Sequence, residues 1–333
     1  MRSALSVSLP LLGALLLAQT ASAQTPAPAP APTNTTAPAI AGVVAAGTTV
    51  EFIKAGFTGT EGPIGLPDGH LIFTETQANR ITRIDRDSGA TSTFLENTNG
   101  SNGLGFDQQG RLISVQTTPG AARIGVIYPA NAVATLTDSY QGKPYGRPND
   151  LVVSRSGHVY FTEPGPNATP GQPPTTPALP PAVYFFRKGG AAVQVATGIE
   201  RPNGIMLSPD EKTLYVNNTS GEYMVAFDVA ADGSTSNRRN FTKYASVTRN
   251  DTGQVNSGAD GLAVDAEGRI YCAAIGGVQV FSPKGEHLGT IPVSLQPQNI
   301  AFAGADKKTL FIVGRGAAFK VRVLTPGFAG RAK

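Results

Sequence analysis

The sequence predicts an all-β fold, a six-bladed β-propeller whose four-stranded antiparallel blades surround a central channel. The first observation is a phrase that recurs six times: a polar residue, a short apolar alternation, a turn with Gly or Asp, and a β-branched or aromatic run. The second is its spacing. The copies start 41, 47, 54, 57 and 39 residues apart, and propeller blades repeat at roughly 40–50 residues. No long helical periodicity favours another fold.

Each copy of the phrase has the pattern of a β-hairpin, two short strands joined by a tight turn. A second hairpin follows in most copies, for example at residues 278–281 and 288–291 in the fifth. One repeat therefore supplies the four strands of a blade. The segment Thr49–Ile53 precedes the first copy. We expect it to form the outer strand of the last blade, next to residues 319–323, because such closure leaves only short, protected edges.

The residues before this segment differ from the propeller in composition. Residues 1–23 have the pattern of a secretory signal peptide, with one arginine, an apolar run and small residues up to a cleavage site at Ala23. Residues 24–42 are rich in Pro, Ala and Thr, which predicts an extended linker without a packed core. The expected domains are a signal peptide over 1–23, a linker over 24–42 and a catalytic propeller over 43–333. The mature protein is expected to be secreted or periplasmic and not held in a membrane.

Charge and cysteine content narrow the possible functions. Lys and Arg number 27 against 23 Asp and Glu, a net charge of +4 without a long basic run, so nothing indicates nucleic-acid binding. No feature indicates an obligate protein partner. The single cysteine, Cys272, lies in an apolar run and is expected to be a buried core residue rather than a catalytic thiol. The proline-rich connection over 164–181 could be a lid or a plain surface insertion.

One polar residue begins each copy of the phrase. In a propeller the innermost strand of each blade lines the channel, so the residue just before it points at the channel mouth. The six residues, called the ring residues below, are Glu61, Asn102, Asn149, Asn203, Asp260 and Asn299. Their carboxylate and carboxamide oxygens suit a hard cation. Asn-Gly and Asp-Gly are also ordinary turn sequences, but the complete set favours one divalent ion, Ca²⁺ first and Mg²⁺, Mn²⁺ or Zn²⁺ as alternatives.

The sequence resembles the gluconolactonase family that includes senescence marker protein and luciferin-regenerating enzyme. The resemblance runs from about residue 50 to 325. It is carried by these motifs: Glu61-Gly-Pro, Asn102-Gly-Leu, Arg147-Pro-Asn149-Asp150, Tyr160-Phe-Thr-Glu-Pro164, Asn203-Gly with Ser208-Pro-Asp, and Asp260-Gly-Leu.

The resemblance implies roles for individual residues. It implies four metal ligands, which are Glu61, Asn149, Asn203 and Asp260. It also implies that Arg147 and Asn149 contact the substrate and that Asp260 is the catalytic carboxylate. Asn102 and Asn299 would complete the ring in an outer or substrate-facing role.

Three positions depart from the family pattern. The chain has Val115-Gln116-Thr117 where many members have Cys-Glu-His, and Glu163 where they have Asp in a Phe-Thr-Asp-Pro run. Asn217-Asn218 stands where an acid often follows Leu-Tyr-Val. These departures leave the metal set intact but bear on the pocket for a sugar lactone.

The expected function is a divalent-metal-dependent hydrolase that opens a lactone ring, with a small-molecule lactone as its partner. A dication would polarise the carbonyl, with Asp260 as general base or nucleophile. Arg147 would steady the oxyanion through its planar fork. Asp150 is the second candidate for the base, or a turn-capping carboxylate. The alternatives are a non-catalytic binding propeller braced by the metal and a phosphotriesterase-like hydrolase.

Overall fold

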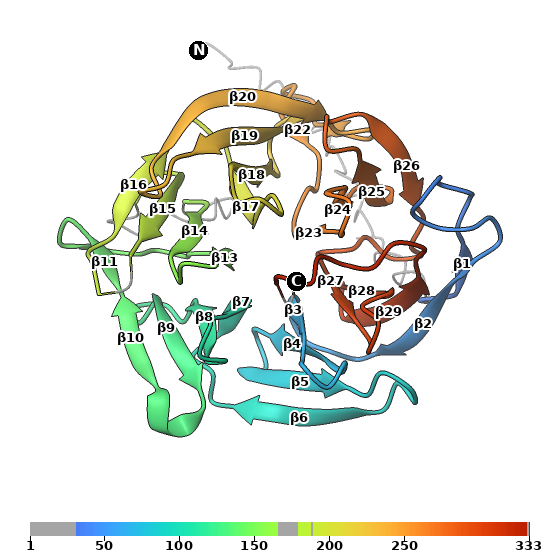
Figure 1. Ribbon diagram of the computed structural model, residues 1–333, viewed down its shortest axis with the longest axis horizontal. Helices are drawn as coiled ribbons and strands as arrows, with labels where there is room; N and C mark the ends of the chain where they lie inside the picture. The colour runs from blue at the N-terminus through green and yellow to red at the C-terminus, as the bar shows by residue number, and fades with distance from the viewer. Residues whose placement is uncertain (1–30, 166–178, 188, 332) are drawn as a thin grey trace, which may run out of the picture. The chain divides into compact units, whose positions relative to one another are not determined.

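Six antiparallel sheets stand around a central channel in a computed structural model, as the sequence predicts (Figure 1). The structure describes residues 31–165, 179–187, 189–331 and 333. Within these ranges the one helix is a short 3₁₀ turn, Ala130–Ala132. The described helices include none long and apolar enough to span a membrane. The compact unit described here is Pro32–Lys333.

The first three blades contain the following strands, from the channel outward. The first blade has β3 (Thr60–Gly65), β4 (Leu71–Glu75), β5 (Arg80–Ile84) and β6 (Thr91–Glu96). The second has β7 (Ser101–Phe106), β8 (Leu112–Gln116), β9 (Arg123–Tyr128) and β10 (Ala134–Thr137). The third has β13 (Leu151–Val153), β14 (Val159–Glu163), β15 (Ala182–Phe186) and β16 (Val193–Ala196).

The other three blades repeat this order. The fourth blade has β17 (Pro202–Leu207), β18 (Thr213–Asn218), β19 (Tyr223–Val229) and β20 (Thr235–Lys243). The fifth has β23 (Leu262–Val264), β24 (Ile270–Ala274), β25 (Gly277–Phe281) and β26 (His287–Ile291). The sixth has β27 (Asn299–Ala303), β28 (Thr309–Gly314), β29 (Ala317–Arg322), β2 (Thr49–Ala55) and β1 (Thr35–Thr36). Two short ribbons lie between blades: β11 (Ser139–Tyr140) with β12 (Lys143–Pro144), and β21 (Thr248–Arg249) with β22 (Val255–Asn256).

Closure of the ring joins an early segment of the chain to a late one. As expected for residues 49–53, strand β2 pairs antiparallel with β29, with Phe52 opposite Phe319. The two rings lie 5.6 Å apart between centroids. The inner strands of the blades are buried on both faces, as in β4 and β24, whereas the outermost strands leave many residues exposed. Closure therefore covers the edge of the sixth blade that would otherwise be open.

Part of the expected linker belongs to the propeller. The chain from Thr35 onward packs on the propeller, because β1 pairs with β2 and the side chains of Ala37 and Ile40 are buried in the core of the closing blade. Apolar residues spaced among prolines and threonines supply that contact. The signal peptide predicted over 1–23 and most of the proline-rich connection over 164–181 lie outside the described residues.

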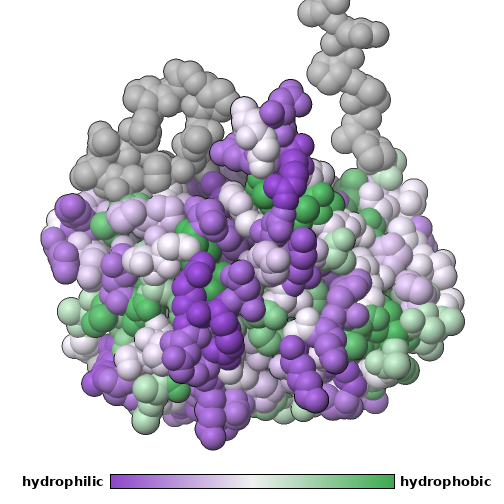
Figure 2. Space-filling model, turned by 90° about the horizontal axis from the view of Figure 1, so that it is seen from above, coloured by the Kyte–Doolittle hydropathy of each residue, from purple (hydrophilic) through white to green (hydrophobic). Residues whose placement is uncertain are grey.

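The core lies between neighbouring blades, and the outer surface is mainly polar. Cys272 is fully buried in β24, which confirms it as a core residue, and burial raises the pKa of its thiol. The outermost strands are more exposed; most residues of β20 face solvent. Hydrophilic residues accordingly cover much of the side of the ring in Figure 2, with hydrophobic ones scattered between them.

Glycines at the start of the inner strands let adjacent blades approach closely. In four blades a glycine directly follows the ring residue, and a Cβ added to it would lie far inside contact distance of the next blade. These distances are 2.0 Å from Gly62 to the Asn102 carbonyl oxygen, 2.4 Å from Gly103 to Asp150 Oδ1, 2.0 Å from Gly204 to the Asp260 carbonyl oxygen, and 1.9 Å from Gly261 to Asn299 Oδ1. Only Gly62 has a positive φ. At the other three positions glycine is needed for space rather than for backbone conformation.

We predict that Gly204→Ala destabilises the propeller, because the new Cβ would lie 2.0 Å from a backbone oxygen of the fifth blade. Overpacking of this kind costs about 1–3 kcal/mol. Thermal unfolding followed by circular dichroism measures the effect. Gly190→Ala is the control: this glycine is exposed, and its added Cβ would come no closer than 3.4 Å to another group. An unchanged unfolding temperature for Gly204→Ala would contradict the role of close blade contact.

Candidate functional site

The structure brings the six ring residues to one end of the channel. Each stands at or just before the start of an inner strand: Glu61 in β3, Asn102 in β7, Asn149 before β13, Asn203 in β17, Asp260 before β23 and Asn299 in β27. Five of these residues are buried, and Asp260 is partly exposed. The six blades thus deliver one polar side chain each to the same place, as the repeat predicts.

Direct contacts join neighbouring ring positions. The amide of Gly103 donates to the Asn149 carbonyl at 3.0 Å, and that of Gly204 donates to the Asp260 carbonyl at 3.1 Å. Asn299 Nδ2 donates to Glu61 Oε2 at 3.3 Å, which links the last blade to the first. The Asn-Gly and Asp-Gly pairs are therefore not free turns, because their backbone groups are used in contacts between blades.

Four oxygens of the ring are left without a partner. Among the described residues, the Oδ1 atoms of Asn102, Asn149, Asn203 and Asp260 are buried and accept no hydrogen bond. Buried polar atoms are nearly always satisfied, and leaving one unpaired costs free energy. Oxygens of amides and carboxylates are the ligands of hard cations such as Ca²⁺. This donor set therefore fits a divalent metal ion.

The described residues contain no group of three or more His, Cys, Asp or Glu side chains placed to hold a metal. The ring itself supplies only two acids, Glu61 and Asp260, and the rest of its oxygens come from amides. A site here would depend on mixed carboxylate and amide coordination, with the two acids matching the charge of a dication.

The two acids of the ring are hard to ionise together. Burial is the main reason that the pKa of Glu61 is raised to about 7 from its usual 4.5, and the charge of Asp150 adds to it. Burial and the charge of Glu61 raise the pKa of Asp260 well above its usual range. Both shifts arise because a low-dielectric environment disfavours unbalanced negative charge. A cation bound between them would remove that penalty.

The positions that depart from the family pattern hold the loops of the channel mouth. In three blades the last residue of the second strand accepts a backbone amide from the loop that leads into the first strand. Glu75 accepts the amide of Thr58 at 2.9 Å, Glu163 that of Arg147 at 3.1 Å, and Asn218 that of Arg201 at 3.1 Å. Burial raises the pKa of Glu163 to about 7. Its longer side chain thus acts as a brace for the loop that carries Arg147.

The other two departures have related roles. Gln116 Oε1 accepts from Asn99 in the loop before β7 at 3.1 Å. Asn217 Nδ2 donates to the carbonyl of Asp260, and its Oδ1 accepts from the Tyr244 hydroxyl at 2.9 Å. Asn217 therefore holds the backbone of Asp260 in place from the neighbouring blade.

Two arginines flank the ring on the third and fourth blades. Arg147 and Arg201 are both half-buried. Burial first and the charge of Arg147 second lower the pKa of Arg201, whereas the charge of Asp260 raises it. Sequence reasoning singled out Arg147 but missed Arg201. The signal was present, since the triplet Arg-Pro-Asn occurs at both 147–149 and 201–203.

Asp150 directly follows the ring residue Asn149 in the sequence, and each of its two carboxylate oxygens accepts a hydrogen bond. Its Oδ1 accepts the amide of Leu151 at 2.9 Å, and its Oδ2 accepts from Lys333 Nζ at 2.6 Å. Asp150 is fully buried. The turn-capping interpretation of this carboxylate therefore accounts for the contact with the Leu151 amide. The other contact is an ion pair with Lys333.

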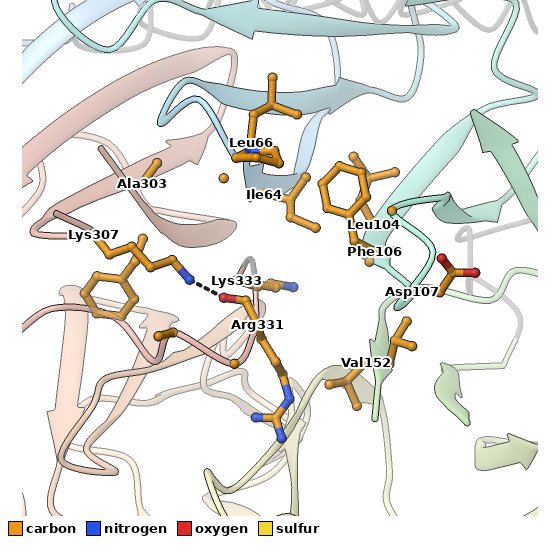
Figure 3. Close-up of a pocket in the computed structure, with 18 of the residues that line it drawn as sticks. Ile64, Leu66, Leu104, Phe106, Asp107, Val152, Ala303, Lys307, Arg331 and Lys333 are labelled. Atoms are coloured by element: carbon orange, nitrogen blue, oxygen red, sulfur yellow. Dashed lines mark hydrogen bonds between the residues drawn. The ribbon is translucent and has the colours of Figure 1, made fainter. Parts of the chain in front are cut away.

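A cavity of about 680 Å³ opens at the opposite end of the channel. It is lined by residues from the second half of the inner strands, such as Ile64, Leu104 and Val152, and by Lys307 and Arg331 (Figure 3). None of the six ring residues lines it. Its walls are mainly apolar, so the chemistry described above belongs to the ring end and not to this cavity.

Comparison with known proteins agrees with the fold. The chain is 29% identical over 312 residues to a gluconolactonase of Zymomonas mobilis, covering 87% of this chain and 85% of that protein. It is 27% identical to the solved structure of a gluconolactonase from Xanthomonas campestris, with a TM-score of 0.74 over 89% of this chain and 98% of that one. The calcium-binding protein regucalcin of Agrobacterium tumefaciens shares the fold, at 18% identity and a TM-score of 0.64, over 84% of this chain and 97% of that one.

These relatives support lactone hydrolysis at the level of the family. The family model of the SMP-30/gluconolactonase/LRE-like region matches residues 59–315, and this range contains all six ring residues. The resemblance inferred from the motifs is thereby confirmed, and the chain belongs to the SMP-30/gluconolactonase/LRE-like family.

Proposed function

We propose that the chain is a divalent-metal-dependent lactonase that opens the ring of a sugar lactone at the ring end of the channel. The observation that carries this proposal is the set of four buried, unpartnered oxygens beside Glu61. The names of the relatives, two gluconolactonases and a calcium-binding protein of the same fold, support it. Ca²⁺ is the ion we place first, because mixed amide and carboxylate oxygens suit it.

The ligands we propose are Glu61, Asn149, Asn203 and Asp260, with Asn102 and Asn299 facing the substrate or completing the ring. When bound, the cation would polarise the lactone carbonyl and stabilise the negative charge that develops on its oxygen. Arg147, held by Glu163 through its backbone amide, would contact the same oxygen or a ring hydroxyl.

Asp260 is the residue we assign as general base. It is the partly exposed acid of the ring, whereas Glu61 is buried and accepts hydrogen bonds at both oxygens, from Gln298 and Asn299. The exposed part of Asp260 faces the channel mouth in our proposal, and a substrate water would approach the carboxylate from there. The carboxylate would take a proton from water as the water oxygen bonds to the carbonyl carbon. The carbonyl carbon–ring oxygen bond then breaks, and the leaving ring oxygen takes the proton. Direct attack by Asp260, giving an acyl-enzyme, is the variant of this step.

Residues 1–23 retain their interpretation as a signal peptide, and we propose that the mature protein acts in the periplasm or outside the cell. A small-molecule lactone is the partner that the site suits. In this proposal the six ring residues in the channel, rather than a patch on the outer surface, carry the chemistry.

The direct test is hydrolysis of glucono-1,5-lactone by the metal-stripped protein and after addition of Ca²⁺, Mg²⁺, Mn²⁺ or Zn²⁺. We expect turnover to disappear on stripping and to return with at least one ion. A phosphotriester is assayed beside the lactone, and hydrolysis of the phosphotriester rather than the lactone would favour the phosphotriesterase-like alternative. Tight metal binding with turnover of neither substrate would favour a binding propeller.

We predict that Asp260→Asn lowers kcat about 10²-fold or more, because a positioned general base contributes about 10²–10⁴. Calorimetry should show that the variant still binds the metal through the remaining oxygens. Asp87→Asn is the matched control, since this carboxylate lies exposed on an outer turn. Retained turnover in Asp260→Asn would exclude Asp260 as base and nucleophile.

We predict that the metal-stripped protein becomes less stable as the pH rises from about 5 to 8. The pKa of Glu61 is raised to about 7 in the folded chain, so the unfolded chain binds fewer protons in this window. The contribution of Glu61 is therefore fully present below its unfolded pKa and is lost as the pH rises through the folded one. Its size is on the order of 1–3 kcal/mol.

Chemical denaturation at several pH values measures this fall. Glu61→Gln should make it shallower but not abolish it, because the pKa of Glu163 is shifted in the same direction. Saturating Ca²⁺ should flatten it in the wild type, since the cation favours the ionised acids. If the stability of Glu61→Gln falls with pH as steeply as that of the metal-free wild type, Glu61 is not the group responsible for the fall.

A further inference from the structure

A buried ion pair lies below the ring, and neither member is a proposed metal ligand. Lys333 Nζ is 2.6 Å from Asp150 Oδ2, and the two side chains are 5% and 1% exposed. Asp150 follows the ring residue Asn149 and precedes the inner strand β13. A lone lysine or aspartate at this depth would be strongly unfavourable, and removing one partner of such a pair leaves the other as a buried, unpaired charge.

The chain approaches this point through contacts with three blades. After β29 the segment 323–331, called the crossing segment, runs under the sixth, fifth and fourth blades. The amide of Phe328 donates to the carbonyl of Val264 at 3.0 Å, and Lys307 Nζ donates to the carbonyl of Phe328 at 2.9 Å. Arg331 donates to the carbonyl of Leu207 at 2.7 Å. Figure 3 shows Arg331 and Lys333 at the apolar cavity, and Figure 1 marks the end of the chain near the centre of the ring.

Both ring acids are influenced by this pair. The charge of Asp150 raises the pKa of Glu61 and of Asp260, whereas the charge of Lys333 lowers both. The channel therefore holds three carboxylates within electrostatic reach of one another. A single dication balances two of them, and the ammonium of Lys333 balances the third. With both in place these three carboxylates are balanced, and the charges of Arg147 and Arg315 act on the ring acids in addition.

We propose that Lys333 is a positioning residue of the metal site: its ammonium holds Asp150 below the ring and balances its charge, so that the ring accepts one dication on Glu61 and Asp260. This inference rests on the proposed function, because it presumes a metal at the ring. It also removes Asp150 from the candidates for the base, since both oxygens of that carboxylate are occupied.

The proposal predicts opposite changes in metal affinity when the two members of the pair are replaced one at a time. Lys333→Met keeps a chain of similar length but removes a positive charge that repels the dication. Asp150→Asn removes a negative charge that attracts it. A unit charge at several ångströms in a partly buried site changes binding by about tenfold or more. We therefore expect Ca²⁺ to bind about tenfold more tightly to Lys333→Met and about tenfold more weakly to Asp150→Asn, with the double variant close to the wild type.

Isothermal titration of the metal-stripped full chain with Ca²⁺ alone measures these affinities. Lys333→Arg keeps the charge and serves as the matched control, with wild-type affinity expected. A role in packing alone would lower the unfolding temperature of the variants without the alternation in sign. Equal Ca²⁺ affinity in the wild type and Lys333→Met would overturn the proposal.

A second measurement separates this inference from the proposed function. Thermal unfolding without metal should show each single variant less stable by several degrees and the double variant partly restored, because only the single variants leave a buried unpaired charge. If the wild type binds no divalent ion, the metal-dependent function fails, while the recovery in the double variant still establishes the ion pair. Independent, additive losses would show that the pair does not form.

Discussion

The close approach of the inner strands is the constraint on which the rest of this structure depends. Six strands can converge on a narrow channel only if backbone meets backbone without intervening side chains. In four of the six blades glycine at the position after the ring residue makes this possible, with Gly204 and Gly261 as the contacts of the fourth and fifth blades. The same contacts fix the ring residues, because amides such as that of Gly204 bond to the ring residue of the next blade. Fold and site are therefore products of one packing arrangement.

Convergence also concentrates charge. Burial is the main reason that the pKa values of Glu61 and Asp260 rise, and the charges of neighbouring carboxylates add to the rise. This negative charge in the buried channel is balanced in two different ways. Lys333 pairs with Asp150 within the chain, whereas we propose that a divalent ion from solution balances the two acids of the ring. A site that is unfavourable when empty binds a dication more strongly for that reason.

The departures from the family pattern become intelligible as supports of this ring. Glu163 and Asn218 hold the loops that carry Arg147 and Arg201, and Asn217 holds the backbone of Asp260. None of these residues replaces a ring oxygen. They act on the placement of the mouth, which is where the substrate of a lactonase would be distinguished from related lactones.

The sequence by itself determined the six blades, the closing strand and the identity of the ring residues. These features repeat, and a repeat shows itself as local periodicity that needs no knowledge of distant contacts. The extent of the linker was not predictable, since Ala37 and Ile40 are buried by a blade that lies far along the chain. Only the tertiary structure decided which ring oxygens lack partners, why glycine follows them, and that Lys333 meets Asp150, 183 residues away. Such pairings leave no trace in local sequence, because they arise only when separate segments are packed against one another.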